Sequence, residues 1–445
     1  MATLSPLPYK GTRDYYPEDK RVQNYIFATW RAVVERYGYQ EYGAPLLEPL
    51  EVYAAKSGQE LAGEQTYTFT DRGDRIVAIR PEMTPSISRM VAARRQELAY
   101  PARLYSIANF MRYERPQRGR EREFWQLNAD IFGVEGAAAD AEIITIAYEV
   151  MKAFGATDDM FVIKMNNRRL IDYMMSSYLG LDAVAAQMMV KLFDRRNKIA
   201  TEEFDQQATE IFGDTAQEGM AKIAQLLQVK TVGDLPTELL QSAAAEDVRE
   251  LTVLLSKAGV KNLQFDVTLM RGLDYYTGTV FEAFDLHPEN NRAMFGGGRY
   301  DGLVGLFGAE PVPTVGMAPG LSTTELFLRS HDLLPELPPT TELGIVVVDD
   351  ASMDGALALA KQFREEGVNV DVDISGRKID KQIKAALKKQ LPFMVFVGET
   401  ELKDQLFNFK DTVTAEEEKL SPERIVARIK DHRRKAQSVD DELYL

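Results

Sequence analysis

The sequence of 445 residues predicts two domains, an N-terminal α+β domain with a helical insertion and a small C-terminal α/β domain. Three observations favour this arrangement. A single hydrophobic core stops growing near about 250 to 300 residues, so a chain of this length is expected to divide. The stretch from 168 to about 260 is rich in helix formers, with strand-like segments on either side of it. Beyond 342, strands and helices alternate.

The first elements of the chain are a helix and several short strands. Apolar residues at helical spacing predict a helix from Lys20 to Tyr37. The stretch from Tyr39 to Leu50 looks extended, and strand-like segments follow at Gln65 to Thr70 and Ile76 to Ile79. A helical run from Met83 to Ala92 comes next.

The centre of the N-terminal domain reads as a long hairpin. Apolar segments at Ala102 to Arg112 and Phe124 to Phe132 flank a polar loop, which is typical of paired strands. A helix is expected from Asp140 to Phe154. After the insertion, strand character returns at Phe265 to Leu269 and Thr279 to Phe284, with a tight turn before the second of them.

The C-terminal third begins after a proline-rich stretch. The prolines of residues 331–341 predict a semi-rigid linker that ends the first domain, residues 1–330. Residues 342–437 alternate strand-like and helical segments and include a basic helix and a final helix that starts at Ser421 and Pro422. Residues 438–445 are expected to form a mobile tail.

Composition excludes several classes of protein. The net charge of −15 argues against indiscriminate binding to polyanions. No apolar stretch is long enough to span a bilayer, so we expect a cytoplasmic protein without membrane contact. The absence of cysteine excludes disulfides, thiolate metal sites and cysteine nucleophiles. The scattered His287, His331 and His432 are expected to be surface residues and not metal ligands.

The polar loop of the hairpin concentrates arginine. Guanidinium groups are permanently charged and bind two phosphate oxygens at once, so five of them in one loop favour an anion site. A solvated charged hairpin is the alternative. The five are Arg112, Arg115, Arg118, Arg120 and Arg122.

The segment Phe110 to Glu114, with Arg120 four residues before Phe124, resembles motif 2 of class II aminoacyl-tRNA synthetases, and its sequence RYERPQRGR resembles that of histidyl-tRNA synthetases. The resemblance implies a catalytic domain built on an antiparallel sheet flanked by helices. Its implied roles are the α-phosphate and substrate carboxylate for Arg112, the adenine amino group for Glu114, the γ-phosphate for Arg120, stacking on adenine for Phe124, and the tRNA acceptor end for Arg115 and Gln117.

The segment Arg271 to Tyr276 resembles a signature of the same family. In that reading Arg271 acts with Arg112 in catalysis and stabilises charge that develops on the α-phosphate. From the residues alone, a structural hairpin of two strands around a glycine-containing bend stays open.

Further motifs predict the histidine pocket. Arg80 to Thr84 resembles the family's loop for the substrate amino group, although a helix start with an early acid would look the same. Gly296 to Gly302 resembles the family's second signature. Asp130 and Tyr276 would pair with the two imidazole nitrogens, and many family members have glutamate at position 130. The implied histidine-binding residues are Glu82, Met83, Thr84, Arg112, Gln126, Asp130, Arg271, Tyr275, Tyr276 and Tyr300.

Two further segments bear on ATP and on assembly. Val315 to Thr323 occupies the place of motif 3, but Thr323 stands where the family has an arginine, so ATP is expected to be held differently or activation to be impaired. Gly38 to Glu48 resembles motif 1 and implies a homodimer, although a buried edge strand that ends in proline would look identical.

The basic helix of the C-terminal domain presents four cations at helical spacing, Arg377, Lys381, Lys384 and Lys388. A solvated face is the usual explanation of such a run. Since the surrounding segments resemble the family's anticodon-binding domain, we expect contact with tRNA.

Together these motifs predict activation of L-histidine by ATP and its transfer to the 3′ end of tRNA(His). Mg²⁺ would be bound mainly through the ATP phosphates, with no organic cofactor and no metal site assigned to side chains. The alternative is a non-catalytic histidine-sensing paralogue such as the regulatory subunit of ATP phosphoribosyltransferase. Thr323 supports that alternative, whereas Arg112, Arg120 and Arg271, together with a C-terminal domain, argue against it.

Overall fold

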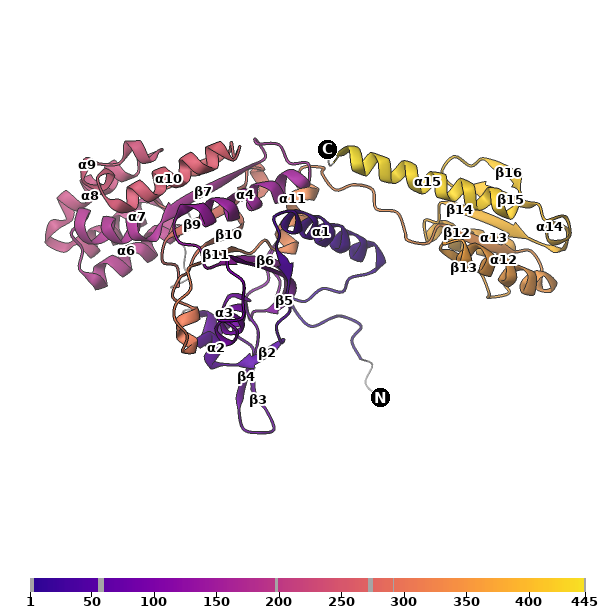
Figure 1. Ribbon diagram of the computed structural model, residues 1–445, viewed down its shortest axis with the longest axis horizontal. Helices are drawn as coiled ribbons and strands as arrows, with labels where there is room; N and C mark the ends of the chain where they lie inside the picture. The colour runs from indigo at the N-terminus through magenta and orange to yellow at the C-terminus, as the bar shows by residue number, and fades with distance from the viewer. Residues whose placement is uncertain (1–3, 55–59, 197–198, 271–274, 291, 444–445) are drawn as a thin grey trace. The chain divides into compact units, whose positions relative to one another are not determined.

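The protein is described by a computed structural model that covers residues 4–54, 60–196, 199–270, 275–290 and 292–443. Its described residues form two compact units (Figure 1). The first contains residues up to 15 and from 22 to 334, and the second contains residues 16 to 21 and those from 335 onward.

The first unit is built on an eight-stranded sheet with the order β1-β5-β6-β11-β10-β9-β7-β8. The six strands from β5 to β7 in this order pair antiparallel, and only the two edge strands pair parallel. The predicted antiparallel sheet is therefore confirmed. The bounds are β1 Gln40–Glu41, β5 Ala102–Met111, β6 Glu123–Phe132, β7 Phe161–Asn167, β8 Leu263–Phe265, β9 Thr279–Asp285, β10 Ala293–Arg299 and β11 Thr314–Met317.

Strands β5 and β6 form the predicted long hairpin. Their register runs without a bulge from Ala102 opposite Phe132 to Met111 opposite Glu123. Because side chains alternate along a strand, a single face of β6 presents Gln126, Asn128 and Asp130. This face forms the floor of the cavity described below.

The strand predicted from Phe265 to Leu269 is found earlier in the chain, as β8, Leu263–Phe265. The Asp266 carboxylate accepts hydrogen bonds from the Thr268 backbone N–H at 3.0 Å and from its hydroxyl at 2.6 Å, which turns the chain and ends the strand. Strand β7 lies between β8 and β9 in the sheet, so the strands before and after residues 271–274 do not pair with each other. The alternative that these two strands form a hairpin with each other, which the residues alone left open, is therefore wrong.

Helices cover the sheet and build the segment between β7 and β8. α4 packs against β6, β9 and β11, and α10 packs on α4. The N-terminal end of α4 is tied to β10 by a buried ion pair, Asp140 Oδ1 to Arg299 Nη2 at 2.7 Å. The helices are α1 Pro17–Arg36, α2 Glu51–Ala54, α3 Thr84–Ala93, α4 Ala137–Ala153, α5 Arg168–Tyr173, α6 Ala183–Arg195, α7 Thr201–Phe212, α8 Ala216–Leu226, α9 Thr237–Leu240, α10 Ala243–Lys257 and α11 Leu321–Ser330.

The segment predicted as a helical insertion contains α5 to α10, and the residues described between 168 and 257 include no strand. Figure 1 shows α6 to α10 gathered beside β7. A separate three-stranded sheet has the order β2-β4-β3, with bounds Leu47–Pro49 for β2, Ile76–Ile79 for β4 and Thr68–Thr70 for β3.

The second unit has a five-stranded sheet with the order β13-β12-β14-β15-β16. Strands β12, β13 and β14 are parallel, as strand–helix alternation predicts, whereas β15 and β16 add an antiparallel hairpin that the sequence analysis missed. The bounds are β12 Leu343–Val347, β13 Val370–Val372, β14 Phe393–Val397, β15 Phe407–Asp411, β16 Glu417–Leu420, α12 Met353–Glu365, α13 Ile379–Lys388, α14 Glu399–Asp404 and α15 Pro422–Leu443.

The last helix, α15, is longer than the sequence analysis expected. α15 continues to Leu443, within the segment expected to be mobile, and the mobility itself stays a prediction. None of the helices in the described part of the chain combines the length and apolar character needed to cross a bilayer.

The expectation that all three histidines lie at the surface is wrong for His331. Its side chain is only 11% exposed, and its Nε2 lies 2.8 Å from Oδ1 of the buried Asp285. His287 packs edge-on against it, with ring centroids 5.3 Å apart. A residue 46 positions away in the chain provides this partner, so no local pattern could reveal it.

Candidate active site

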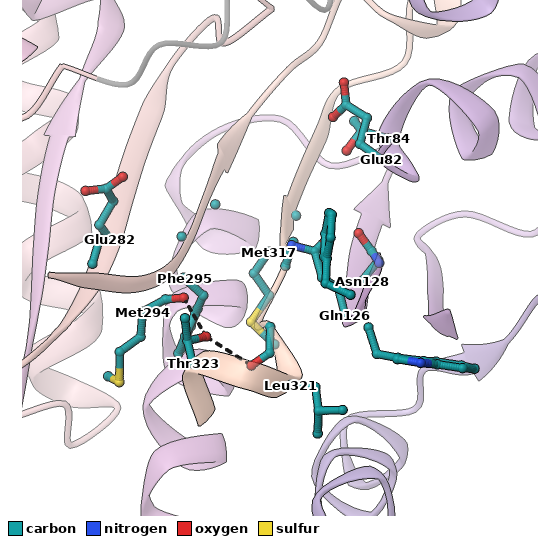
Figure 2. A pocket seen from close by; sticks show the side chains of 18 of the residues that line it. Glu82, Thr84, Gln126, Asn128, Glu282, Met294, Phe295, Met317, Leu321 and Thr323 are labelled. Atoms are coloured by element: carbon teal, nitrogen blue, oxygen red, sulfur yellow. Dashed lines mark hydrogen bonds between the residues drawn. The ribbon is translucent and has the colours of Figure 1, made fainter. Parts of the chain in front are cut away.

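A cavity of about 350 Å³ lies over β6, β10 and β11 and is bounded by the first turn of α11 and the arginine-rich loop. This volume falls in the range of small-molecule sites. Figure 2 shows that its lining side chains come from segments far apart in the sequence. Of the residues singled out by sequence, it brings together Glu82, Thr84, Arg112, Glu114, Arg120, Phe124, Gln126, Asp130, Tyr275, Tyr276 and Tyr300.

Glycine makes the floor of the cavity possible. A Cβ atom on Gly316 of β11 would lie 1.9 Å from Oδ1 of Asp130, and one on Gly297 of β10 would lie 2.1 Å from the Gly316 carbonyl oxygen. Neither approach is compatible with a side chain. Gly316 therefore leaves room for the Asp130 carboxylate, and Gly297 lets β10 and β11 approach closely.

Asp130 is the most perturbed acid of the site. Its side chain is buried and accepts a short hydrogen bond from the Tyr300 hydroxyl. Burial raises the pKa of Asp130 to about 7, and the Tyr300 hydrogen bond opposes this rise in part. Asp130 and Tyr300 thus form a buried polar pair in the cavity wall, suited to a ligand that can hydrogen-bond to it.

The loop before α3 carries two more polar groups into the cavity. Arg80 is buried and donates to the carbonyl oxygens of Ala44 at 2.8 Å and Asn109 at 2.9 Å, which fixes the loop. Glu82 accepts a hydrogen bond from Tyr275 at 3.2 Å. Met83 does not line the cavity, because it packs in a core cluster with Ala108 and Phe110.

The other end of the cavity holds the cations. Glu114 lies between two arginines, with its carboxylate 3.9 Å from Arg112 Nη1 and 3.8 Å from Arg120 Nη1. The Arg112 guanidinium lies 5.2 Å from the centroid of the Phe124 ring, and its Nε donates to the Pro81 carbonyl oxygen at 2.9 Å. A flat aromatic ring beside two arginines can bind a nucleotide through its base and its phosphates.

The Thr323 hydroxyl hydrogen-bonds to the backbone at this end. It donates to the carbonyl oxygens of Met294 at 2.9 Å and Gly320 at 3.0 Å, as the dashed lines in Figure 2 show. It thereby ties the start of α11 to β10. Within the described residues, α11 contributes only Leu321, Ser322 and Thr323 to the cavity, so this helix brings no cation to it.

Several predicted residues lie elsewhere. Arg115 and Gln117 are exposed at the loop tip, outside the cavity, and Gln117 Oε1 accepts from Arg292 at 3.2 Å. Arg122 is buried behind the loop. Arg271 lies outside the described residues, so its predicted role stays a prediction.

The cavity also contains residues that sequence reasoning missed. Asn128 lies between Gln126 and Asp130 on the same face of β6, so strand alternation could have found it. Glu282 is opposite Gly296 across β9 and β10. Other missed lining residues are Glu121, Trp125, Met294, Phe295, Met317 and Ser322. The described part of the chain holds no group of three acidic or histidine side chains placed to bind a metal ion.

In the second unit, the basic face of α13 is exposed. Lys381, Lys384 and Lys388 point to solvent, whereas Gln382 is buried and hydrogen-bonds to both the N–H and the carbonyl oxygen of Val347. Arg377, just before the helix, forms a 2.7 Å ion pair with Asp373. The three lysines are therefore available to an anionic partner.

Comparison with known proteins gives consistent results over the whole chain. A family model described as histidyl-tRNA synthetase matches residues 11–323, and one described as anticodon binding domain matches residues 342–432. The histidine–tRNA ligase of Leptospira biflexa is 38% identical over 95% of this chain and 97% of its own length. That of Opitutus terrae is 36% identical over 97% and 99%. A crystal structure of histidyl-tRNA synthetase from Nostoc sp. PCC 7120 aligns with a TM-score of 0.81 and 25% identity, covering 97% of this chain and 100% of that one.

Proposed function

The chain belongs to the histidyl-tRNA synthetase family, and on that premise we propose that it activates L-histidine with ATP and transfers the histidyl group to the 3′ end of tRNA(His). It is thus a class II aminoacyl-tRNA synthetase, a ligase. The observation that carries the proposal is the single cavity in which a buried acid pocket adjoins an arginine-lined nucleotide end.

At the nucleotide end, Phe124 would stack on adenine and Glu114 would accept from its amino group. Arg112 would bind the α-phosphate and the histidine carboxylate, and Arg120 the γ-phosphate. Their positions beside Glu114 support these roles, because the arginines can turn from that carboxylate to phosphate oxygens. Arg271 would supply the second charge on the α-phosphate. Activation of histidine and its transfer to tRNA then both depend on proximity and fixed charge, without a covalent enzyme intermediate.

At the other end, Glu82 and Thr84 would accept hydrogen bonds from the histidine ammonium group. Asp130 and Tyr276 would pair with the imidazole nitrogens, with Gln126, Tyr275 and Tyr300 around them. A pocket discriminates strongly between amino acids when a wrong side chain would leave its buried polar groups without hydrogen bonds. The buried Asp130 is such a group.

The partners of the reaction follow the same reasoning. Mg²⁺ would be held mainly by the ATP phosphates. Arg115 and Gln117 would meet the tRNA acceptor end, and Arg377, Lys381, Lys384 and Lys388 the anticodon region. A cytoplasmic location is the expectation for such an enzyme.

We propose a homodimer on separate grounds. Strand β1 is an edge of the main sheet, and the neighbouring small sheet exposes large apolar side chains. Large apolar side chains left exposed on a sheet favour a protein interface. The side chains are Leu46, Leu47, Phe69 and Ile76, which are 44% to 53% exposed.

The regulatory paralogue is the weaker reading. Residues 342–432 match an anticodon binding domain. A histidine sensor has no need of such a domain, whereas a ligase requires contact with tRNA. Thr323, the feature that favoured the paralogue, has a structural role, because its hydroxyl links the start of α11 to β10.

The test is histidine-dependent exchange of labelled pyrophosphate into ATP, with other amino acids as controls. Exchange with histidine alone supports the proposal and shows that Thr323 is tolerated. Histidine binding without exchange would favour the sensor instead.

A further inference from the structure

The segment from Tyr9 to Arg13, which we call the N-terminal strap, precedes α1 and lines no part of the cavity within the described residues. It nevertheless contacts both structures that wall the nucleotide end. One is the base of the arginine-rich loop, and the other is α11.

The strap passes directly over the base of the loop. Gly11 has a φ of +87°, which L side chains rarely adopt. A Cβ atom there would lie 2.8 Å from Cγ of Arg122 and 2.9 Å from Cγ of Pro116. The Arg122 N–H donates to the Gly11 carbonyl oxygen at 2.6 Å. Only glycine allows this close passage.

Arg122 connects the strap to the residues that line the cavity. Its Nη1 donates to the Tyr9 hydroxyl and its Nε to the Glu114 carbonyl oxygen, both at 3.1 Å. Its guanidinium lies 4.1 Å from the centroid of the Tyr113 ring. Its own carbonyl oxygen accepts from the Arg112 N–H at 2.8 Å. Arg122 therefore fixes the backbone of both Arg112 and Glu114.

The other end of the strap reaches α11. Arg13 Nη1 lies 2.8 Å from Oε2 of Glu325, whose side chain is only 9% exposed. One turn earlier in the same helix, Ser322 and Thr323 line the cavity. The strap thus holds the loop base and the helix start at once.

We propose that the N-terminal strap positions the ATP-binding residues, with Gly11 and Arg122 as positioning residues that act through Arg112 and Glu114. The inference rests on the proposed function, because it concerns how that site binds ATP. The polar groups at the histidine end do not depend on the strap, since Glu82 and Asp130 are held by Tyr275 and Tyr300 instead.

The experiment measures ATP and histidine affinity separately in the full-length protein. The chain has two tryptophans, of which Trp30 is buried in the core and Trp125 lines the cavity, so tryptophan fluorescence reports binding without catalysis. Gly11→Ala and Arg122→Ala should weaken ATP binding about tenfold, since small misplacements of binding groups have effects of this size. Histidine binding should weaken by a smaller factor, because Arg112 would also bind the histidine carboxylate, whereas Glu82 and Asp130 are held independently of the strap. Arg122→Lys, which keeps the charge but loses the guanidinium contacts, should fall between Arg122→Ala and the wild type.

Gly38→Ala is the matched control. Gly38 has a similar φ of +80°, but a Cβ atom there would meet nothing within 4 Å. It should leave ATP affinity unchanged. Equal losses for ATP and histidine in Gly11→Ala, an unchanged ATP affinity, or the same loss in Gly38→Ala would overturn the inference. If Arg122→Ala fails to fold, Gly11→Ala still decides. Wild-type protein that shows no pyrophosphate exchange would reject the proposed function instead.

Discussion

Asp130 shows how burial sets the properties of one residue. Its carboxylate lies against Gly316 of β11, with Tyr300 as its hydrogen-bond donor. The raised pKa of about 7 means that the folded protein holds the proton more tightly than the unfolded chain, where aspartate titrates near about 3.9. The contribution of this group to stability is therefore largest below pH 4 and falls as pH rises to about 7.

Asp130→Asn removes this titration. The free energy of unfolding of the variant, relative to the wild type, should rise between pH 4 and pH 7 by at most about 4 kcal/mol, which is the value of a shift of this size. Urea denaturation at several pH values measures it. Asp205→Asn, at an exposed position of α7, serves as the control for the loss of one carboxylate. If the free energy of unfolding of Asp130→Asn and of the wild type changed with pH in parallel, a raised pKa of Asp130 in the folded protein would be contradicted.

At the scale of elements, the site depends on how closely three strands approach. β6, β11 and β10 are adjacent in the sheet. Gly316 is paired with Asp130 across β11 and β6, and its lack of a side chain leaves the space that the Asp130 carboxylate occupies. The hairpin β5–β6 supplies the floor, and the loop at its far end supplies the cations. The sheet thus joins the two halves of the site.

Gly316→Ala tests this arrangement. The added Cβ would lie 1.9 Å from the Asp130 carboxylate and must displace it. The KM for histidine in pyrophosphate exchange should rise at least about tenfold, because a displaced polar partner costs binding of this order.

Gly302→Ala is the control for this variant, because a Cβ there would meet nothing within 4 Å. It should leave the KM for histidine unchanged. A normal KM for histidine in Gly316→Ala would show that Asp130 does not contact the substrate.

At the scale of the whole molecule, two units separate the chemistry of activation from the proposed contact with the anticodon region of the tRNA. The first unit contains the whole described cavity. The second offers exposed lysines on α13, anchored by the buried Gln382. A change on α13 should therefore affect tRNA charging and not adenylate formation.

Lys381→Glu should lower kcat/KM for tRNA about threefold to tenfold at low salt, and less at high salt, because phosphate contacts weaken with ionic strength. Pyrophosphate exchange should stay at the wild-type rate. Lys361→Glu on α12, an exposed lysine of the same unit, is the matched control. Equal effects of both reversals would indicate a general charge effect and remove α13 from tRNA binding.

Much of the fold is readable from local patterns. Hydrophobic spacing predicts α1, the β5–β6 hairpin and the strand–helix alternation of the second unit, because these depend on residues close in sequence. The β15–β16 hairpin was missed because its strands are short, and β16 has three exposed charged residues before its one buried residue, Leu420. β15 does alternate Phe407 and Phe409 with polar residues, a pattern that could have predicted it. β8 is displaced because the Asp266 side chain ends the strand, a contact that hydrophobicity does not record.

By itself, the sequence determined the family, the order of most elements and eleven of the residues that line the cavity, because motifs and periodicity are properties of neighbouring residues. The tertiary structure decided what each charge is used for. It places Arg112 and Arg120 in the cavity but buries Arg122 under the strap, and it turns Met83 into the core and pairs His331 with Asp285. These assignments depend on contacts between residues far apart in the chain, and burial and pairing exist only once the chain has folded.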